Sequence, residues 1–581
     1  MFGFKVIFSC LILVLICCSS TLAAEAAGEE LFQNYLKNPD PLLEGLSDAE
    51  VVRLGERMYR DGILPSGKVM EAVYGEMSID STAFSCSSCH LRSGLGSVEG
   101  GVVTPAATGR KLYQPYSRPP SIQDRVDLSG SYTYAKTIQH RPAYTRETLK
   151  EALHYGDDPA GVTFNGIMPR YPLSKGDMAI LVRYLELLCA EDSPGASPGL
   201  IKFATILTDD VNAADRESLL TPLRRFVAAQ NRQVDMYRDF LKFGYKPTGD
   251  MKYSFRNATL AIWDLKGAPE SWGEQLAAYY QEEPVFAVLG GISNQSWQPI
   301  HDFCEAQRLP CLYPITQLPA VSADSWYTFY LNKGYFKEGE AVARYLQTQT
   351  ANIPAGKILQ LIQSSANGRA LAEGFSQGRK SRRQPEVEHL ELSAEQLQDE
   401  AKLTSLIAQK KPEIILIWAD AEILPHLKKI AAQADASARI FFSSTLLGAQ
   451  TIQIPDELRS RVFLTFPYRL KPYFGDEEAA TKLATVPINT TYEVFAKRRI
   501  ATRTMVMLTQ SVSQGLRLLY DNLYRDYLLD VMSMQMDKIV FDYERLSFGP
   551  GQRYASKGCY IIQLGPGPQP ELIKRSEWVI R

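Results

Sequence analysis

Apolar runs separated by amphipathic helical stretches dominate the last two-thirds of the chain. The runs span 201–207, 258–265, 285–291, 309–316, 357–365, 387–393, 413–420 and 439–446. Strands that are apolar along their whole length, with helices between them, are typical of parallel sheets covered on both faces. The pattern therefore predicts an α/β region built from doubly wound parallel sheets in two lobes.

The chain before residue 191 has a different pattern, with amphipathic helices separated by long irregular loops. Between the two regions, "EDSPGASPG" combines Pro, Gly, Ser and acidic residues, a composition that favours a linker. We expect a signal peptide over 1–24, an all-α domain over 25–190, a linker over 191–200 and an α/β domain with two interleaved lobes over 201–581.

The first residues carry the pattern of an export signal. Lys5 precedes an apolar run from Val6 to Cys18, and small residues follow, with a cleavage position near Ala23 or Ala24. This order is typical of secretory signal peptides. The run is shorter than the roughly 20 residues that span a bilayer. We therefore expect the mature chain to lie in the periplasm without a membrane span.

The composition limits the class of partner. The chain has 581 residues, of which 45% are hydrophobic and 22% charged, with a formal net charge of −2. These values are typical of several packed globular domains. Nucleic acid is not expected as a partner, because phosphate binding needs clustered Lys and Arg.

Residues 84–92, "FSCSSCHLR", place Cys86, Cys89 and His90 in Cys-x-x-Cys-His spacing. This is the spacing at which two thioether bonds hold a haem c while the adjacent histidine ligates its iron. A zinc site needs a second pair of ligands at matching spacing, and none lies near. A thioredoxin-like dithiol needs a helix after the motif, but a glycine-rich loop follows. The motif therefore favours covalent haem.

Met168 is the expected second axial ligand. It lies in the loop "GIMPRY", before a helix that Ser174 caps, and His140 and His154 are the alternatives. A haem with both axial positions filled transfers electrons and has no open site for peroxide or oxygen. We therefore expect no enzyme activity, and a peroxidase-like site is the alternative that an open haem would bring.

With these features, residues of about 30–190 resemble the class I c-type cytochrome domain. The resemblance implies one covalent haem c and gives Pro105 the role of holding the ring of His90 through its carbonyl group. It also implies that an N-terminal helix with Gly55 and Tyr59 crosses the helix of Leu181 and Tyr184. Residues 60–85 form an insertion relative to the small members of the family.

Residues 201–581 resemble the type I periplasmic solute-binding proteins of the branched-chain amino-acid and amide class. The most specific segments are 286–316, 356–378 and 546–564. The resemblance implies two lobes joined by three crossings of the chain, with the ligand between them. It places ligand contacts at Ser293, Asn294, Thr316 and Asp420.

Each of these four residues has a predicted role and a structural alternative. Ser293 and Asn294 are expected to open a helix whose N-terminus suits an anion. Asp420 ends a strand and would meet an amine, and Thr316 ends another strand. Residues of these types are also common as helix caps and in turns.

Two functions compete. The main hypothesis is an exported c-type cytochrome that transfers single electrons, with a binding module that senses a small molecule or docks a periplasmic redox partner such as a dehydrogenase. The alternative is a substrate-binding protein of an ABC-type importer with an accessory haem domain, taking an amino-acid-like or amide-like ligand. Cys304 and Cys311 flank a helix-to-strand turn, where a local disulfide and two free thiols are both consistent with the sequence.

Overall fold

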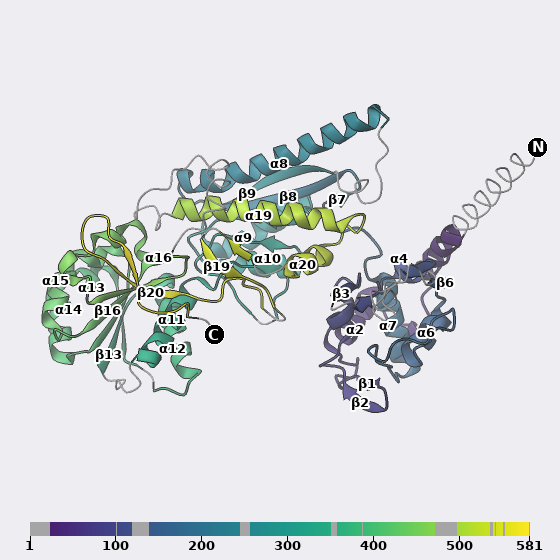
Figure 1. Cartoon of the computed structure of the whole chain (residues 1–581), viewed down its shortest axis with the longest axis horizontal. Coiled ribbons are helices and arrows are strands. Elements are labelled where there is room, and N and C mark those ends of the chain that lie inside the picture. The colour runs from purple at the N-terminus through teal and green to yellow at the C-terminus, as the bar shows by residue number, and fades with distance from the viewer. Residues whose placement is uncertain are drawn as a thin grey trace, which may run out of the picture. The chain divides into compact units, whose positions relative to one another are not determined.

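The computed structural model describes residues 24–99, 102–118, 139–244, 256–322, 324–349, 357–385, 387–470, 497–534, 538–540, 542–549 and 552–579. The signal-peptide prediction lies outside these residues, apart from position 24. The chain divides into two compact units, Met1–Asp192 and Ser193–Arg581 (Figure 1). Within the described residues, no helix is long and apolar enough to cross a membrane.

The N-terminal unit is mainly helical. Its helices are 24–37, η1 (Pro41–Leu43), α2 (Asp48–Asp61), α3 (Cys86–His90), α4 (Gly109–Leu112), α6 (Arg146–His154) and α7 (Lys175–Leu187). Three antiparallel strand pairs accompany them: β1 (Glu71–Tyr74) with β2 (Met77–Asp80), β3 (Ser97–Glu99) with β4 (Val102–Thr104), and β5 (Tyr116–Arg118) with β6 (Gln139–Arg141). The prediction of an all-α unit is therefore wrong, because these loop segments satisfy their main-chain groups by pairing.

The crossing of α2 and α7 forms the core of this unit. Ser174 caps α7, where its hydroxyl accepts a hydrogen bond from the Asp177 main-chain N–H at 3.1 Å. A Cβ added to Gly55 would lie 2.3 Å from the Cβ of Tyr184, so the two helices touch at a position that only glycine allows. The rings of Tyr59 and Tyr184 lie 5.5 Å apart between their centroids. The predicted contact between the two helices is confirmed.

The C-terminal unit contains two sheets, and we call the first, with its helices, lobe 1. Its strands are β7 (Ala196–Ser197), β8 (Leu200–Thr208), β9 (Asn257–Leu265), β10 (Ala287–Leu289), β11 (Cys311–Leu312) and β12 (Thr328–Phe329). The order β9-β8-β10-β11-β12 is parallel throughout, and β7 pairs antiparallel with the start of β8. The helices of lobe 1 are α8 (Ala213–Lys242), α9 (Trp272–Glu282), α10 (Gln298–Ala306), α19 (Lys497–Leu519) and α20 (Arg525–Ser533).

Lobe 2 is built on the second sheet, with the strand order β14-β13-β15-β16-β17-β20-β21. Its strands are β13 (Ile358–Gln363), β14 (His389–Leu392), β15 (Ile414–Trp418), β16 (Arg439–Ser443), β17 (Val462–Phe466), β20 (Tyr560–Leu564) and β21 (Leu572–Lys574). The first five strands in this order are parallel, but β20 and β21 are antiparallel to their neighbours. The sheet is therefore mixed, whereas the sequence predicted a purely parallel one.

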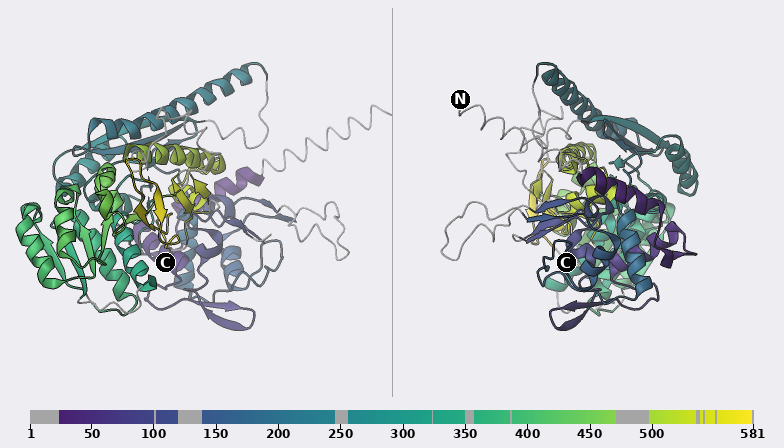
Figure 2. Two further views of the ribbon diagram at one scale, coloured as in Figure 1. Left: turned by 60° about the vertical axis from the view of Figure 1, so that its left-hand side comes forward. Right: turned by 90° about the vertical axis from the view of Figure 1, so that its right-hand side faces the viewer.

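Helices cover both faces of the lobe 2 sheet (Figures 1 and 2). One face carries α11 (Gly334–Gln349) and α12 (Ala366–Lys380), and the other carries α14 (Glu400–Lys410) and α15 (Leu427–Gln433). In β15, Ile415 and Ile417 pack against α14 and α15. Ile414, Leu416 and Trp418 point to the other face and pack against α11 and α12. Burial on both faces explains why every residue of this strand is apolar.

The chain passes between the lobes three times. It enters lobe 2 after β12, returns to lobe 1 for α19, which packs along α8, and reaches lobe 2 again for β20. Before that last crossing, Tyr554 pairs with Tyr330 at the edge of the lobe 1 sheet. The strands β18 (Lys538–Val540) and β19 (Tyr543–Leu546) form an antiparallel pair just before it.

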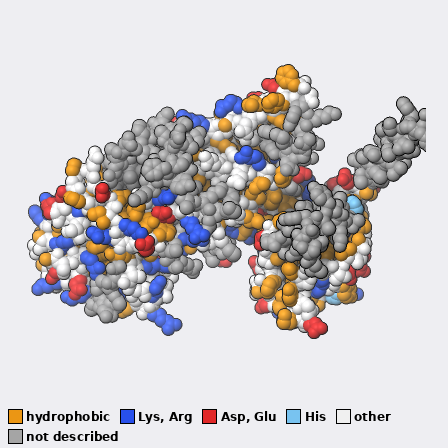
Figure 3. Space-filling view, in the orientation of Figure 1, with side chains coloured by type: hydrophobic (Ala, Val, Ile, Leu, Met, Phe, Trp, Pro, Cys, Tyr) orange, Lys and Arg blue, Asp and Glu red, His pale blue; other side chains and the backbone are white. Residues whose placement is uncertain are grey.

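On the face shown in Figure 3, basic and acidic side chains are interspersed over the molecule.

Candidate functional site

Two predicted ligand residues of lobe 1 lie side by side at the carboxyl edge of its sheet. Ser293 follows β10 and Thr316 follows β11, and the Ser293 main-chain N–H donates to the Ile315 carbonyl oxygen at 3.3 Å. Both side chains are largely buried, with exposed fractions of 2% and 8%. Parallel strands end at the same edge, which is where doubly wound sheets bind ligands.

Asn294 does not open a helix, because α10 begins only at Gln298 and no side chain caps it. The Asn294 main-chain N–H donates to Asp210 Oδ2 at 3.0 Å, and its side-chain amide donates to the Asp210 carbonyl oxygen at 3.0 Å. The prediction that Ser293 and Asn294 open a helix is therefore wrong, and their role as ligand contacts stays a prediction. Pro299 in the first turn of α10 is the sequence signal that marks the true start.

Asp420 follows β15 by two positions and lies at the carboxyl edge of the lobe 2 sheet. Its Oδ2 accepts a hydrogen bond from Gln363 Nε2 at 2.8 Å, and its Oδ1 accepts one from the Glu422 main-chain N–H at 3.1 Å. The carboxylate thus caps the 3-10 helix η5 (Ala421–His426). Because each carboxylate oxygen can accept further hydrogen bonds, this arrangement leaves Asp420 able to receive a donor from a ligand.

The structure adds Glu338, which the sequence did not single out, to the polar groups at this edge. The Ser443 hydroxyl donates to Glu338 Oε2 at 2.7 Å, and the Thr465 hydroxyl donates to the same oxygen. Glu338 is fully buried, and burial raises the pKa of its carboxyl group to about 7. A buried, ionisable group therefore lies between α11 and the ends of β16 and β17.

A tight contact joins the edge of lobe 1 to the first helix of lobe 2. The Tyr335 main-chain N–H donates to the Gln317 carbonyl oxygen at 3.1 Å. Gly334 has a φ of +55°, and a Cβ at this position would lie 2.1 Å from the same oxygen. Only glycine fits here, so the residue after Thr316 is fixed against the start of the helix that carries Glu338.

In the N-terminal unit, the ring of His90 is held by a main-chain carbonyl group. His90 Nδ1 lies 2.8 Å from the Pro105 oxygen. Since a carbonyl oxygen only accepts, this contact places the imidazole proton on Nδ1 and leaves the Nε2 lone pair for a metal. Burial lowers the pKa of His90, which favours the neutral ring that a metal needs.

The two cysteines of the motif lie in α3 and differ in exposure. Cys86 is partly buried, its sulfur lies 4.0 Å from the Tyr171 hydroxyl oxygen, and burial raises the pKa of its thiol to about 11. Cys89 is exposed. Met168 is partly buried and packs against the core of the unit. The neutral imidazole, the two thiols and the thioether are donors of the kinds that fit a covalently attached haem.

The insertion over 60–85 reaches the loop that carries Met168. Within it, β1 and β2 form a hairpin, and the main chain of Val73 pairs with that of Arg170. The guanidinium group of Arg170 donates to the carbonyl oxygens of Tyr155 at 2.8 Å, Phe164 at 3.1 Å and Met168. Arg170 and the hairpin together hold this loop.

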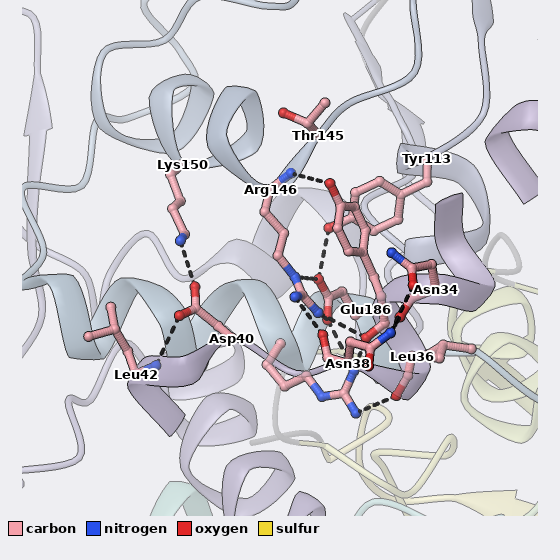
Figure 4. Close-up of polar contacts among 12 residues, drawn as sticks. Asn34, Leu36, Asn38, Asp40, Leu42, Tyr113, Thr145, Arg146, Lys150 and Glu186 are labelled. Carbon is pink, nitrogen blue, oxygen red and sulfur yellow. Dashed lines mark hydrogen bonds and ion pairs between the residues drawn. The ribbon is translucent and has the colours of Figure 1, made fainter. Parts of the chain in front are cut away.

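A buried ion cluster holds the helices of this unit together (Figure 4). Glu186, on α7, is fully buried and accepts from Arg146 Nε at 2.6 Å and from Arg183 Nη1 at 3.1 Å. The Tyr113 hydroxyl donates to the same carboxylate at 3.0 Å. Both guanidinium groups also donate to the Tyr35 carbonyl oxygen, which fixes helix 24–37 to the core.

The solved structures that are similar to this protein cover about two-thirds of the chain. A possible leucine/isoleucine/valine-binding protein from Rhodopirellula baltica is 15% identical, covering 66% of this chain and 98% of its own, with a TM-score of 0.45. A solute-binding protein from R. palustris in complex with benzoate is 13% identical over 66% and 98%, with a TM-score of 0.44. A branched-chain amino-acid transporter protein from Thermus thermophilus with bound valine is 10% identical over 66% and 97%, with a TM-score of 0.45.

No protein-family model matches the chain, and no curated protein matches it in sequence. The matched structures are described as binding or transport proteins. The expectation that the chain has no enzyme activity stays a prediction.

The classification of the chain as a heme- and iron-binding electron-transport protein of the cytochrome c type is corrected. The part of the chain that the structure describes contains no group of three or more His, Cys, Asp or Glu residues that could hold a metal ion. The matched structures are described as binding or transport proteins, not as cytochromes. The narrower prediction of one haem attached to Cys86 and Cys89 stays a prediction.

Proposed function

We propose that this chain is an exported solute-binding protein of the periplasm and that its ligand contacts the carboxyl edges of both sheets of the C-terminal unit. The observation that carries this proposal is the juxtaposition of Ser293 and Thr316 at neighbouring strand ends. Asp420 occupies the corresponding edge of lobe 2, two positions after β15. Ligands of open α/β sheets bind at this edge, because the loops that follow the strands converge there.

The side chains at the two edges suggest a small amino-acid-like or amide-like ligand. The hydroxyl groups of Ser293 and Thr316 can donate to a carboxylate or carbonyl oxygen, and the carboxylate of Asp420 can accept from an amine or amide nitrogen. A charge-assisted hydrogen bond to Asp420 would contribute more than either hydroxyl. Valine and benzoate, which two of the matched structures contain, are useful first probes of this class.

Thermal unfolding of the full mature chain with a panel of amino acids, amides and small aromatic acids tests the proposal. A ligand present at about 100 times its Kd stabilises the folded state by about 2.7 kcal/mol. We expect at least one compound to raise the melting temperature and Asp420→Ala to abolish that shift. The matched control is Asp435→Ala, since Asp435 caps a turn at the opposite edge of the same sheet. A panel without any shift would contradict the proposal.

We further propose that one haem c is attached to Cys86 and Cys89 and that His90 and Met168 are its axial ligands. The hydrogen bond from His90 Nδ1 to Pro105 supports this, because it orients the ring and frees Nε2. When bound, such a haem supplies a one-electron redox couple. In the protein itself, the Pro105 carbonyl fixes the imidazole, and Arg170 and the β1–β2 hairpin hold the Met168 loop.

Covalent haem is tested by a haem stain on a denaturing gel of the chain produced with a haem-attachment system. We expect a stained band at the mass of the full mature chain and no band for the double variant Cys86→Ala/Cys89→Ala. Cys189→Ala, in which a cysteine outside the motif is removed, should stain like the wild type. An unstained wild-type band would contradict this second proposal and leave the solute-binding proposal intact.

A further inference from the structure

Two thiols of lobe 1 lie in contact within its apolar core. Cys304 belongs to α10 and Cys311 is the first residue of β11, and both are fully buried in the same hydrophobic cluster. Their thiol groups are within hydrogen-bond reach of each other. The chain reverses direction between the helix and the strand, which brings together two cysteines that are seven positions apart.

Hydrogen bonds fix the short connection between these two cysteines. The Leu309 main-chain N–H donates to the Cys304 carbonyl oxygen at 2.8 Å, and the Cys311 N–H donates to the Tyr327 carbonyl oxygen at 2.8 Å. Arg525 Nη1 donates to the carbonyl oxygens of Gln307 and Arg308 at 3.1 and 3.3 Å. The turn is thus anchored on α10, on the residue before β12 and on α20.

The other cysteines of the mature chain occupy separate environments. Cys189 lies in the N-terminal unit, with its sulfur 3.3 Å from the Ser93 carbonyl oxygen. Cys559 is buried in lobe 2, where its thiol donates to the Tyr560 carbonyl oxygen at 3.4 Å. Cys86 and Cys89 belong to the haem motif. Cys304 therefore has one thiol neighbour in the C-terminal unit, and that neighbour is Cys311.

We propose that Cys304 and Cys311 are joined by a disulfide bond that forms as the exported chain folds, an inference that rests on the proposed periplasmic location. The oxidant is a protein disulfide of the thiol–disulfide oxidoreductase class. The thiolate of one cysteine attacks this disulfide to form a mixed disulfide, and the second thiolate then displaces the oxidoreductase. The chain loses two electrons and two protons, and the oxidoreductase disulfide is reduced to two thiols.

Burial determines when the exchange takes place and what it achieves. The hydrogen bond with Cys311 and then burial raise the pKa of the Cys304 thiol, so the thiolate needed for attack is accessible only before the core closes. Once formed, the bond is shielded from reductants. It joins α10, which follows Ser293 in the chain, to β11, which precedes Thr316.

Tryptic peptide mapping can detect this bond directly, because trypsin cuts after Arg308, between the two cysteines. The full chain is expressed with its leader, and the protein is purified from the periplasmic fraction, denatured in N-ethylmaleimide without reductant and digested. We expect peptides 267–308 and 309–333 to appear joined, with a mass two hydrogen atoms below their sum. Reduction before alkylation should separate them, and peptides 184–202 and 558–574, which carry Cys189 and Cys559, should be alkylated in both samples.

A second measurement follows the effect of the bond on the folded chain. Dithiothreitol reaches the bond as the chain unfolds on heating, so it should lower the melting temperature of the wild type by about 3 °C and leave that of Cys304→Ser/Cys311→Ser unchanged. Separate, fully alkylated peptides 267–308 and 309–333 from periplasmic protein would overturn the proposal.

Failure of export is distinguished from failure of the disulfide by a second preparation. If the chain does not reach the periplasm, the export proposal fails, and the disulfide is then judged on chain 25–581 denatured and refolded in a glutathione redox buffer. Joined peptides after refolding support the disulfide, and alkylated separate peptides overturn it.

Discussion

The main chains of Val73 and Arg170 pair in both directions. The Val73 N–H donates to the Arg170 carbonyl oxygen at 2.8 Å, and the Arg170 N–H donates to the Val73 carbonyl oxygen at 2.9 Å. Val73 lies in the insertion over 60–85, and Arg170 follows Met168 by two positions. The insertion therefore holds the loop that carries Met168 in place through main-chain hydrogen bonds. The sequence alone did not predict this role.

Removal of the Arg170 side chain should loosen this loop. In Arg170→Ala, the carbonyl oxygens of Tyr155, Phe164 and Met168 lose their charged donor, at a cost of about 1–3 kcal/mol in local stability. We expect faster hydrogen exchange in the peptide over 164–171 by about tenfold or more. Lys175→Ala, an exposed substitution on the adjacent helix, is the control. Equal exchange in the two variants would show that the main-chain pair with Val73 is sufficient.

Neutralising Glu186 should destabilise the N-terminal unit strongly. Glu186→Gln keeps the shape of the side chain but removes the carboxylate that pairs with the buried Arg146, and it leaves Arg183 with Asp48 as its remaining acidic partner (Figure 4). Breaking a buried pair in this way costs about 3–5 kcal/mol. Calorimetry of the full chain should show the transition of this unit at a lower temperature, with the C-terminal unit unchanged. Glu147→Gln, an exposed neighbour on α6, should leave both transitions in place.

The buried carboxyl group of Glu338 makes the stability of the C-terminal unit depend on pH. Burial raises its pKa from the ordinary 4.5 to about 7 in the folded state. As the pH rises from about 4.5 to 7, the unfolded chain ionises first, so the free energy of unfolding falls by up to about 3 kcal/mol. Glu338→Gln should remove this dependence, because glutamine can still accept from Ser443 and Thr465 and never ionises.

Urea unfolding of wild type and Glu338→Gln at pH 5 and pH 8 measures this effect. The variant should gain stability relative to the wild type at pH 8, and the gain should shrink at pH 5. Glu373→Gln, on the neighbouring helix α12, is a control that should show a constant difference at both pH values. A constant difference for Glu338→Gln as well would contradict the raised pKa.

Patterns within single segments predicted much of the fold. The unbroken apolar run of β15 indicated a strand covered on both faces, and its burial by helices on both sides follows from the same residues. Ser174 and the apolar stripe after it indicated α7. The resemblance to the class I c-type cytochrome domain, rather than a pattern within one segment, predicted the contact between the helix of Gly55 and that of Tyr184, and the structure has the two helices touching at this glycine.

The sequence did not predict the contacts between segments that are far apart along the chain. Glu338 is one of several charged residues near the start of α11, and its burial depends on hydroxyl groups more than a hundred positions away. Gln363 binds Asp420 across two strands, 57 positions apart. Asn294 was assigned to a helix N-terminus because its type suits a cap, whereas its side chain binds the loop after β8.

The central claim is that a small ligand binds at the carboxyl edges of both sheets, and hydrogen exchange with a stabilising compound from the panel tests it most directly. The account predicts that saturation slows exchange in peptides covering 293–297 and 316–318 of lobe 1, and 363–365 and 420–423 of lobe 2. Peptides at the opposite edge, such as 435–438, should not change. Protection confined to other segments, or absent at a saturating concentration, would contradict the claim.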